Sequence, residues 1–369
     1  MSATVSQDER LLLELLKRAV QQGATDLHLA GNAPPVIRVR GELTPLTALG
    51  VITPEISQKM IFAILSDYQQ EEFITDKELD FAYEASGIGR FRVNVFFERN
   101  AIGAAFRRIP DEPIPIGKLG LPPVLPKLCE KKSGLLIISG ATGSGKTTTL
   151  AACIDYINSH FSRHIITIED PIEYIHKNKK SLIRQREVGL HTNSFTSALR
   201  VCLRQDPDVI LVGEMRDIDS IRVTLTAAET GHLVFSTLHT NSAIDSIARI
   251  VDVFSSEQQS QIRVQLSATL EGVLSQTLIP LASGKGMCLA CEVLVATSAV
   301  RNIIRDGRLH TLKSVLEIGS DSGMQTMESS LKELYLMGKI SYESAIARAT
   351  DIEAFKKLIG VAPPDSAVS

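Results

Sequence analysis

Tryptophan is absent from this sequence of 369 residues, and tyrosine and phenylalanine bring the aromatic content to only 5%. An excess of one charge is also missing, because 39 basic and 42 acidic residues give a net charge of −3. A generally positive surface that attracts nucleic acid or an anionic membrane is therefore excluded. Long apolar runs are lacking too, and residues 1–10 have no apolar signal core, so we expect a cytoplasmic protein without a membrane-spanning segment.

Cysteine is scarce and unevenly spaced. The five cysteines are Cys129, Cys153, Cys202, Cys288 and Cys291. An odd, scattered set suits reduced thiols better than a disulfide framework. Cys288 and Cys291 form half of a zinc knuckle, but no second C-x-x-C or histidine pair supplies the two further ligands. We expect no metal there, and the sequence gives the pair no other role.

The remaining composition is that of a folded protein of more than one domain. Hydrophobic residues make up 44% and charged residues 22% of the chain, which is enough apolar material for sizeable cores. At about 150 residues per domain, the length predicts two or three domains. Six prolines within 110–126 disfavour regular structure, so we place a linker there.

The segments on the two sides of this linker have different patterns. Residues 1–109 show a helical stretch at 9–22, another opening at Pro54, and alternating strand patterns at 26–29, 36–40, 90–96 and 101–109, which indicates a small α+β domain. Residues 127–369 begin with short apolar strands at 135–139, 165–168, 209–212 and 233–237, separated by helices. This order predicts a mainly parallel α/β sheet covered on both faces, with a helical region from about 323.

A complete phosphate-binding motif, GxxxxGK[ST], follows the first strand of the second domain. Its residues are Gly140, Ala141, Thr142, Gly143, Ser144, Gly145, Lys146 and Thr147, and Thr148 continues into a predicted helix. Glycines allow backbone N–H groups to turn inward around phosphate oxygens. In such a loop the lysine reaches the β- and γ-phosphates and the threonine hydroxyl ligates Mg²⁺. The motif predicts ATP and Mg²⁺ as ligands.

Carboxylates end two of the predicted strands. Glu214 follows 209–212, where Gly213 stands in place of the usual aspartate, and position alone makes Glu214 either a metal partner or a base. Glu169, Asp170 and Glu173 follow the strand at 165–168. A helix cap or solvated turn accounts for Glu169 or Asp170 singly, but less well for the cluster. His232 and His239 flank the strand at 233–237, about 23 Å apart if extended, which disfavours a shared metal.

Taken together, these segments resemble the type II/IV secretion (GspE/PilT) superfamily of ATPases, and within it the PilT-like retraction branch. The resemblance rests on four boxes in order, GATGSGKTTT, ITIEDPIEY, DPDVILVGEMRD and TAAETGHLVFSTLHT. It extends to 24–29, 91–94, 298–305 and 323–327, although SAVRNIIRD at 298–306 departs from the family's AIRNLIRE. The length and the missing tetracysteine site favour the retraction branch.

The resemblance implies a RecA-like P-loop core, a PAS-like N-terminal domain and a homohexameric ring in which ATP lies between subunits. It also implies residue roles: Glu173 activates water, Glu214 binds Mg²⁺ directly or through water, and His232 and His239 couple nucleotide state to domain rotation. Arg92 and Arg107 match the positions of arginines that reach a neighbour's ATP. The resemblance also places Lys146 among the catalytic residues.

The implied function is a motor that retracts type IV pili and acts on an inner-membrane platform protein, alone or with a paralogous motor ATPase. The alternatives are a pilus extension or type II secretion ATPase, a non-catalytic ring component, and a ring that translocates nucleic acid. The last is disfavoured because the basic run of Lys177, Lys179, Lys180, Arg184 and Arg186 has no interleaved aromatic residues to stack bases, so we interpret it as a solvated loop or interface.

Overall fold

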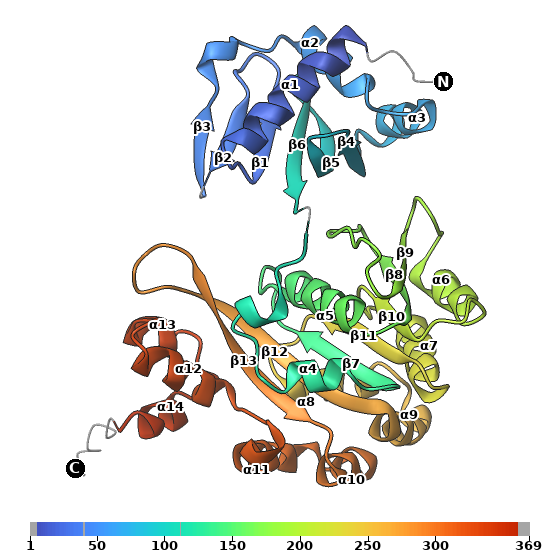
Figure 1. Ribbon diagram of the computed structural model, residues 1–369, viewed down its shortest axis with the longest axis vertical. Helices are drawn as coiled ribbons and strands as arrows, with labels where there is room; N and C mark the ends of the chain where they lie inside the picture. Colours follow the sequence, from blue (N-terminus) through green and yellow to red (C-terminus); the bar gives the residue numbers. More distant parts are fainter. Residues whose placement is uncertain (1–5, 40, 111, 361–369) are drawn as a thin grey trace. The chain divides into compact units, whose positions relative to one another are not determined.

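The computed structural model describes residues 6–39, 41–110 and 112–360 (Figure 1). These residues form two compact units, one made of the chain up to Glu112 with Pro171–Ile175, and the other of Pro113–Asp170 and the residues from His176 onward. The division lies inside the proline-rich segment 110–126. That segment contains a 3-10 helix (Ile116–Lys118), and α4 (Leu125–Cys129) begins before the segment ends.

The first unit is a six-stranded antiparallel sheet with helices. Its strands are β1 (Asp26–Leu29), β2 (Val36–Val39), β3 (Glu42–Pro45), β4 (Glu78–Ala85), β5 (Gly89–Glu98) and β6 (Ala101–Ile109), in the spatial order β3-β2-β1-β6-β5-β4. The helices are α1 (Gln7–Gln21), α2 (Pro54–Phe62), α3 (Asp67–Asp76) and the 3-10 helix Thr47–Leu49. Alternation along the strands buries Leu27, Val93 and Phe106 in one core with helix residues such as Leu12 and Met60. The short β3 and the elements α3 and β4 were not predicted.

The second unit is built on a seven-stranded sheet that is parallel except at one edge. Its strands are β7 (Gly134–Ser139), β8 (His164–Glu169), β9 (Leu182–Glu187), β10 (Val209–Val212), β11 (Leu233–Leu238), β12 (Leu270–Pro280) and β13 (Met287–Val295), in the order β13-β12-β7-β11-β10-β8-β9. β13 alone pairs antiparallel, with β12. The predicted strands at 135–139, 165–168, 209–212 and 233–237 are each found to within one residue. Their continuous apolar runs reflect burial on both faces.

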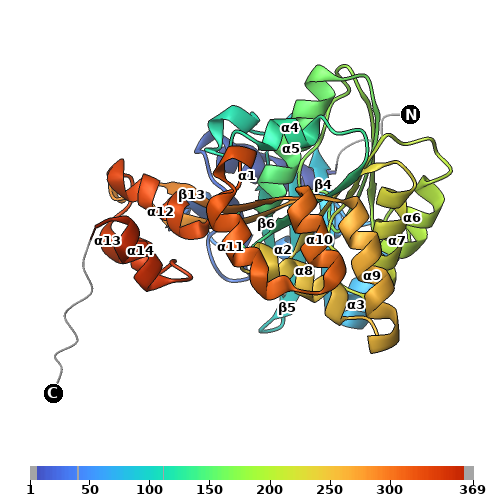
Figure 2. The ribbon, with the colours of Figure 1, turned by 90° about the horizontal axis from the view of Figure 1, so that it is seen from below.

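Helices cover both faces of this sheet, as Figure 2 shows from below. Besides α4, they are α5 (Lys146–His160), α6 (Phe195–Cys202), α7 (Ile218–Glu229), α8 (Ala243–Asp252), α9 (Ser256–Thr269), α10 (Ser298–Asp306) and α11 (Leu312–Ile318), with 3-10 helices Leu309–Thr311 and Ser320–Ser322. Alternate residues of β7 divide between two cores. Leu136 and Ile138 pack with α4 and α5, whereas Leu135 and Ile137 pack with α6 to α11.

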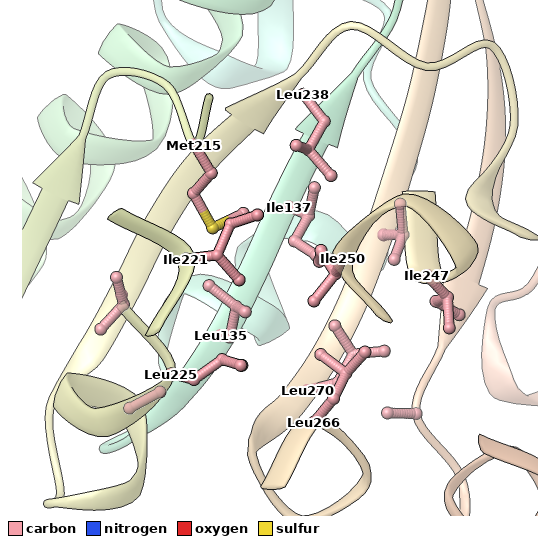
Figure 3. Packing of buried hydrophobic residues seen from close by; sticks show 14 of the residues in the cluster. Leu135, Ile137, Met215, Ile221, Leu225, Leu238, Ile247, Ile250, Leu266 and Leu270 are labelled. Atoms are coloured by element: carbon pink, nitrogen blue, oxygen red, sulfur yellow. The ribbon is translucent and has the colours of Figure 1, made fainter. Parts of the chain in front are cut away.

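The larger of these two cores fixes the register of the strands relative to one another. Figure 3 shows Leu135 and Ile137 of β7 facing Ile221 and Leu225 of α7, with Ile250 of α8 beside them. Both β7 residues are fully buried. Removing a methyl group from such a core typically costs about 1 kcal/mol. The apolar packing therefore fixes where each strand ends, and with it the position of the polar residues that follow.

The C-terminal helices pack on the β12–β13 hairpin, which was not predicted. They are α12 (Met327–Leu336), α13 (Tyr342–Ile346) and α14 (Ile352–Leu358). Ile279 of β12 and Ala290 of β13 are buried against Leu331 and Phe355 of these helices. The helical character expected from about 323 is confirmed for the residues described up to 360, apart from an isolated bridge between Gln325 and Val293.

The interpretation of the basic run as a solvated loop is wrong in part. Arg184 and Arg186 lie on β9, the edge strand of the sheet, paired with β8. On this strand Ile183 and Glu187 are buried, and the other residues are exposed or half-buried. The sequence of the strand therefore carries only a weak apolar pattern. Charged side chains on an edge strand discourage pairing with a further chain.

We expect the stability of the second unit to fall as pH rises because of Glu292 on β13. Its Oε1 accepts a hydrogen bond of 2.7 Å from Ala243 N, the first residue of α8, and burial raises the pKa of Glu292 from 4.5 to about 7, with Glu328 and Asp245 adding to the rise. The folded chain then binds more protons than the unfolded chain between these values. The unfolding free energy contributed by Glu292 is present below pH 4.5 and is lost as pH rises through about 7.

Glu292→Gln should remove this dependence, so that the stability of the variant relative to the original chain increases across that pH range by no more than about 3 kcal/mol. Denaturant unfolding at a series of pH values measures it. Glu257→Gln makes the same chemical change at an exposed position of α9 and should follow the unmodified chain. If the unfolding free energies of Glu292→Gln and of the unmodified chain change with pH in the same way, Glu292 is not the source of the pH dependence.

Candidate nucleotide-binding site

The phosphate-binding motif forms the turn between β7 and α5, as the sequence predicted. Gly140, Gly143 and Gly145 have φ angles of +144°, +79° and +89°, which residues with a side chain rarely adopt. Gly140 is also sterically enclosed, because a Cβ atom there would lie 2.4 Å from the carbonyl oxygen of Gln276. The loop therefore depends on glycine for backbone direction at three positions and for close packing at one.

Lys146 and the first turn of α5 complete the loop. Lys146 Nζ donates hydrogen bonds to the carbonyl oxygens of Gly140 (2.7 Å) and Ala141 (3.1 Å), and its side chain is buried. Thr147 and Thr148 follow it at the N-terminus of α5, a helix of 15 residues. The N–H groups at a helix N-terminus lack intrahelical partners and face the positive end of the helix dipole, which favours a phosphate.

Parallel pairing brings a second set of residues to the edge of the sheet where the loop lies. β11 pairs with β7 on one side and with β10 on the other, so Leu238 lies opposite Ser139 and Ser236 opposite Val212. The residues that follow these strands therefore project from the same edge. Thr237 Oγ1 donates a hydrogen bond of 2.6 Å to Gly213 O, which holds the turn before Glu214 against β11.

Glu214 and His239 meet beside the loop. Glu214 Oε2 lies 2.8 Å from Arg216 Nε and 3.5 Å from His239 Nε2, while the other ring nitrogen of His239, Nδ1, lies 3.5 Å from Thr142 Oγ1. The imidazole thus stands between the carboxylate and the phosphate loop.

The acidic cluster after β8 separates into residues with different surroundings. Glu169 is buried and accepts hydrogen bonds from Thr167 Oγ1 (2.6 Å) and Gln185 Nε2 (3.3 Å), so it joins β8 to β9. Packing at the strand end accounts for Glu169, whereas Asp170 is exposed. Glu173 is half-buried in the segment Pro171–Ile175, which belongs to the first compact unit. Its assignment as the base stays a prediction.

Three predicted residues are not brought to this edge within the second unit. His232 precedes β11 at the opposite edge of the sheet, where its Nδ1 lies 2.9 Å from Ala227 O, so the structure does not group it with the phosphate loop. Arg92 and Arg107 lie in the first unit, opposite each other on β5 and β6. Arg107 Nε donates to Asp26 Oδ1 at 2.9 Å, and Arg92 Nε lies 3.9 Å from Asp80 Oδ1. Register places the two guanidinium groups on one face of their sheet.

Sequence reasoning missed two residues that contact the site. Arg216 lies inside the box DPDVILVGEMRD, two residues after Glu214, but was given no role there. Gln276 comes from β12, which was not predicted, and its Nε2 donates a hydrogen bond of 2.7 Å to Ser144 O. The pairing of β12 with β7 that brings Gln276 to the loop is a long-range contact, which local sequence does not reveal.

The cysteine pair has no metal-binding geometry. Residues three apart on a strand point to opposite faces, and Cys288 and Cys291 both lie on β13. Burial raises the pKa of Cys291 to about 12, which keeps it a neutral thiol. In the part of the chain that the structure describes, no group of three or more His, Cys, Asp or Glu side chains is placed to hold a metal ion.

Comparisons with known proteins agree with this geometry. The family described as type II/IV secretion system protein matches residues 118–351. The type IV pilus retraction ATPase PilT of Pseudomonas aeruginosa is 45% identical over 93% of this chain and 99% of its own length. A twitching motility protein of Neisseria gonorrhoeae is 43% identical over 93% of this chain and 91% of its own length.

The fold is likewise similar to that of a solved structure. The crystal structure of the pilus retraction motor PilT with bound ADP superposes with a TM-score of 0.89 at 46% identity, covering 94% of this chain and 99% of that one. The α/β architecture with a RecA-like core is thereby confirmed. The agreement includes both compact units, because it extends over nearly the whole length of both chains.

The enclosure of Gly140 gives a prediction about the loop. Gly140→Ala forces the new Cβ against Gln276 O, so we expect loss of ADP binding together with several kcal/mol of stability. In Gly143→Ala the Cβ meets nothing within 4 Å, so the cost is confined to the left-handed backbone, about 1–2 kcal/mol. Calorimetric ADP titration and thermal unfolding of the two variants measure the difference. Equal losses in both would show that backbone direction alone, not packing on Gln276, requires glycine at 140.

Proposed function

The chain belongs to the type II/IV secretion system protein family, and from this membership we propose that it is the ATP-driven motor that powers retraction of type IV pili. It is an α/β ATPase with a RecA-like core. The observation that carries the proposal is the assembled phosphate loop with Glu214 and His239 beside it, in a chain that matches the named retraction ATPase over 99% of that protein's length.

The loop residues bind ATP through their backbone. Gly140 to Gly145 direct N–H groups toward the phosphates, and Lys146 exchanges its bonds to the carbonyls of Gly140 and Ala141 for phosphate oxygens. Because these carbonyls already hold Nζ at the mouth of the loop, the ammonium group needs a short movement only. The charge it supplies stabilises the phosphoryl oxygens as they become more negative during transfer.

The donors for Mg²⁺ fit the usual pattern of an ATPase. Mg²⁺ is held by one or two protein oxygens together with phosphates and water, and it neutralises charge on the phosphates when bound. Thr147 at the start of α5 and Glu214 after β10 offer a hydroxyl and a carboxylate. Arg216 and His239 keep Glu214 oriented.

The remaining roles need a second subunit or a movement of the chain. We assign Glu173 as the general base that takes a proton from the attacking water, and Arg92 and Arg107 as arginines that reach ATP in a neighbouring subunit of a homohexamer. Their exposure supports this: the side chains of Arg92 and Arg107 are 42% and 72% exposed. We assign His232 and His239, at the two ends of β11, to the coupling of nucleotide state to domain rotation.

The motor is expected at the cytoplasmic face of the inner membrane, bound to the platform protein of the pilus machine, alone or with a paralogous motor. Nowhere in residues 6–39, 41–110 and 112–360 does a helix combine the length and hydrophobicity needed to cross a bilayer. Attachment is therefore proposed to go through the partner protein.

The assignment of the base predicts the behaviour of Glu173→Gln. The amide cannot accept a proton, so turnover should fall by about 10²-fold or more while ADP affinity is retained. Glu169→Gln is the matched control, since it changes a neighbouring carboxylate that is bonded to Thr167 and Gln185, and it should reduce stability more than turnover at saturating ATP. Steady-state phosphate release and ADP titration separate the two. Full turnover in Glu173→Gln would reassign the base.

A deletion experiment tests the direction of the motor. We expect cells without the gene to carry abundant surface pili and to lose twitching motility, because fibres are assembled but not withdrawn. The wild-type gene should restore motility, whereas Lys146→Ala, which loses the phosphate-binding ammonium group, should not.

Electron microscopy and a twitching assay read out the experiment. Cells without pili would move the protein to the extension branch. Normal piliation and motility would contradict a sole retraction role and point to a redundant motor or another secretion client.

A further inference from the structure

Strand β12 contacts the phosphate loop at both ends of the loop, Gly140 and Gly145, although β12 lies more than a hundred residues later in the chain. β12 runs parallel to β7, with Ser275 opposite Ser139, and the two hydroxyl groups bond at 2.9 Å. The next residue, Gln276, has its carbonyl oxygen against Gly140 and its side chain against Gly145. A Cβ atom at Gly145 would lie 3.2 Å from Gln276 Nε2.

The amide of Gln276 forms a single directional bond to the loop. Nε2 donates to Ser144 O at 2.7 Å, and Gln276 is only 3% exposed. Its Oε1 is buried without a hydrogen-bond partner among the described residues. The amide is therefore oriented by the bond to Ser144 O. Without this donor, the Ser144 carbonyl would lose its bond inside the protein, which destabilises the present orientation of the peptide group.

Holding the carbonyl of Ser144 also fixes the N–H group of Gly145. The two belong to one planar trans peptide group, in which C=O and N–H point in opposite directions. Because the C=O points to β12, the N–H points away from β12. Gly145 has a φ of +89° and tolerates rotation of this peptide group more readily than other residues, so an external restraint matters at this position.

We propose that Gln276 is a positioning residue for nucleotide binding, which holds the Ser144–Gly145 peptide so that the Gly145 N–H faces the phosphates. The inference rests on the proposed ATPase function of this loop. Gln276 does not touch the phosphates itself in this account. It removes the free-energy cost of turning the peptide group when the nucleotide arrives, and preorganised donors of this kind bind charge more tightly than mobile ones.

Three variants of the full chain test the proposal, with ADP as the probe. Gln276→Met keeps the length of the side chain and removes the donor, and it should raise the Kd for ADP about tenfold or more, the scale of one hydrogen bond to a charged group. Ser275→Ala is the matched control, because it removes a buried hydrogen bond at the neighbouring position of the same strand without touching the loop. Its Kd should stay within about twofold of the original value. Titration calorimetry measures Kd, and thermal unfolding without nucleotide measures the loss of stability.

Gln276→Glu gives a signature that packing alone would not produce. An ionised carboxylate repels the Ser144 carbonyl, whereas a protonated carboxyl regains an O–H donor, and burial keeps a carboxyl pKa high enough for this exchange. The ratio of Kd in Gln276→Glu to Kd in the original chain should therefore be larger at pH 8 than at pH 6. This variant decides the question if Gln276→Met does not fold.

The inference is overturned if Gln276→Met binds ADP within about twofold of the original chain, if Ser275→Ala weakens binding as much, or if the ratio for Gln276→Glu does not change with pH. Failure of the unmodified chain to bind ADP is a different result. It would overturn the proposed ATPase function and this inference with it, whereas normal binding by the original chain confines any failure to the role of Gln276.

Discussion

The parallel register of β7, β11 and β10 is the constraint on which the site depends. Because β11 lies between the other two, the residues that follow all three strands emerge at one edge of the sheet. The phosphate loop, Glu214 and His239 are brought together in this way from segments about a hundred residues apart. The register in turn depends on apolar packing, part of which Figure 3 shows, since a slip of β7 by one residue would exchange the side chains that pack in its two cores.

His239 lies between two parts of this site. Its ring lies between Glu214 Oε2 and Thr142 Oγ1, at 3.5 Å from each. Both distances are at the limit of a hydrogen bond, so the imidazole is not committed to either partner. Glu214 has a shorter contact with Arg216, at 2.8 Å. Glu214 is therefore held more closely by Arg216 than by the imidazole that lies between it and the phosphate loop.

The sequence allowed accurate prediction where local pattern and motif coincide. The turn from β7 to α5 was predicted in full, because glycine, lysine and an apolar strand each have a local physical requirement there. β12 was not predicted, since it follows α9 directly and its apolar residues carry no turn signal between them. Gln276 was missed for that reason. Glu169 and Glu173 looked alike in sequence, and only the contacts of Glu169 with Thr167 and Gln185 separate a packing role from a free carboxylate.

The same strand that restrains the phosphate loop also carries the C-terminal helices. Gln276 and Ile279 are three residues apart on β12, and Ile279 is buried against the helical cluster that includes Leu331 and Phe355. β12 therefore contacts the phosphate loop through Gln276 and the C-terminal helices through Ile279, so one strand belongs both to the nucleotide site and to the packing of these helices. Protein interiors are close-packed, so the position of such a strand depends on the residues that cover it as well as on its neighbours in the sheet.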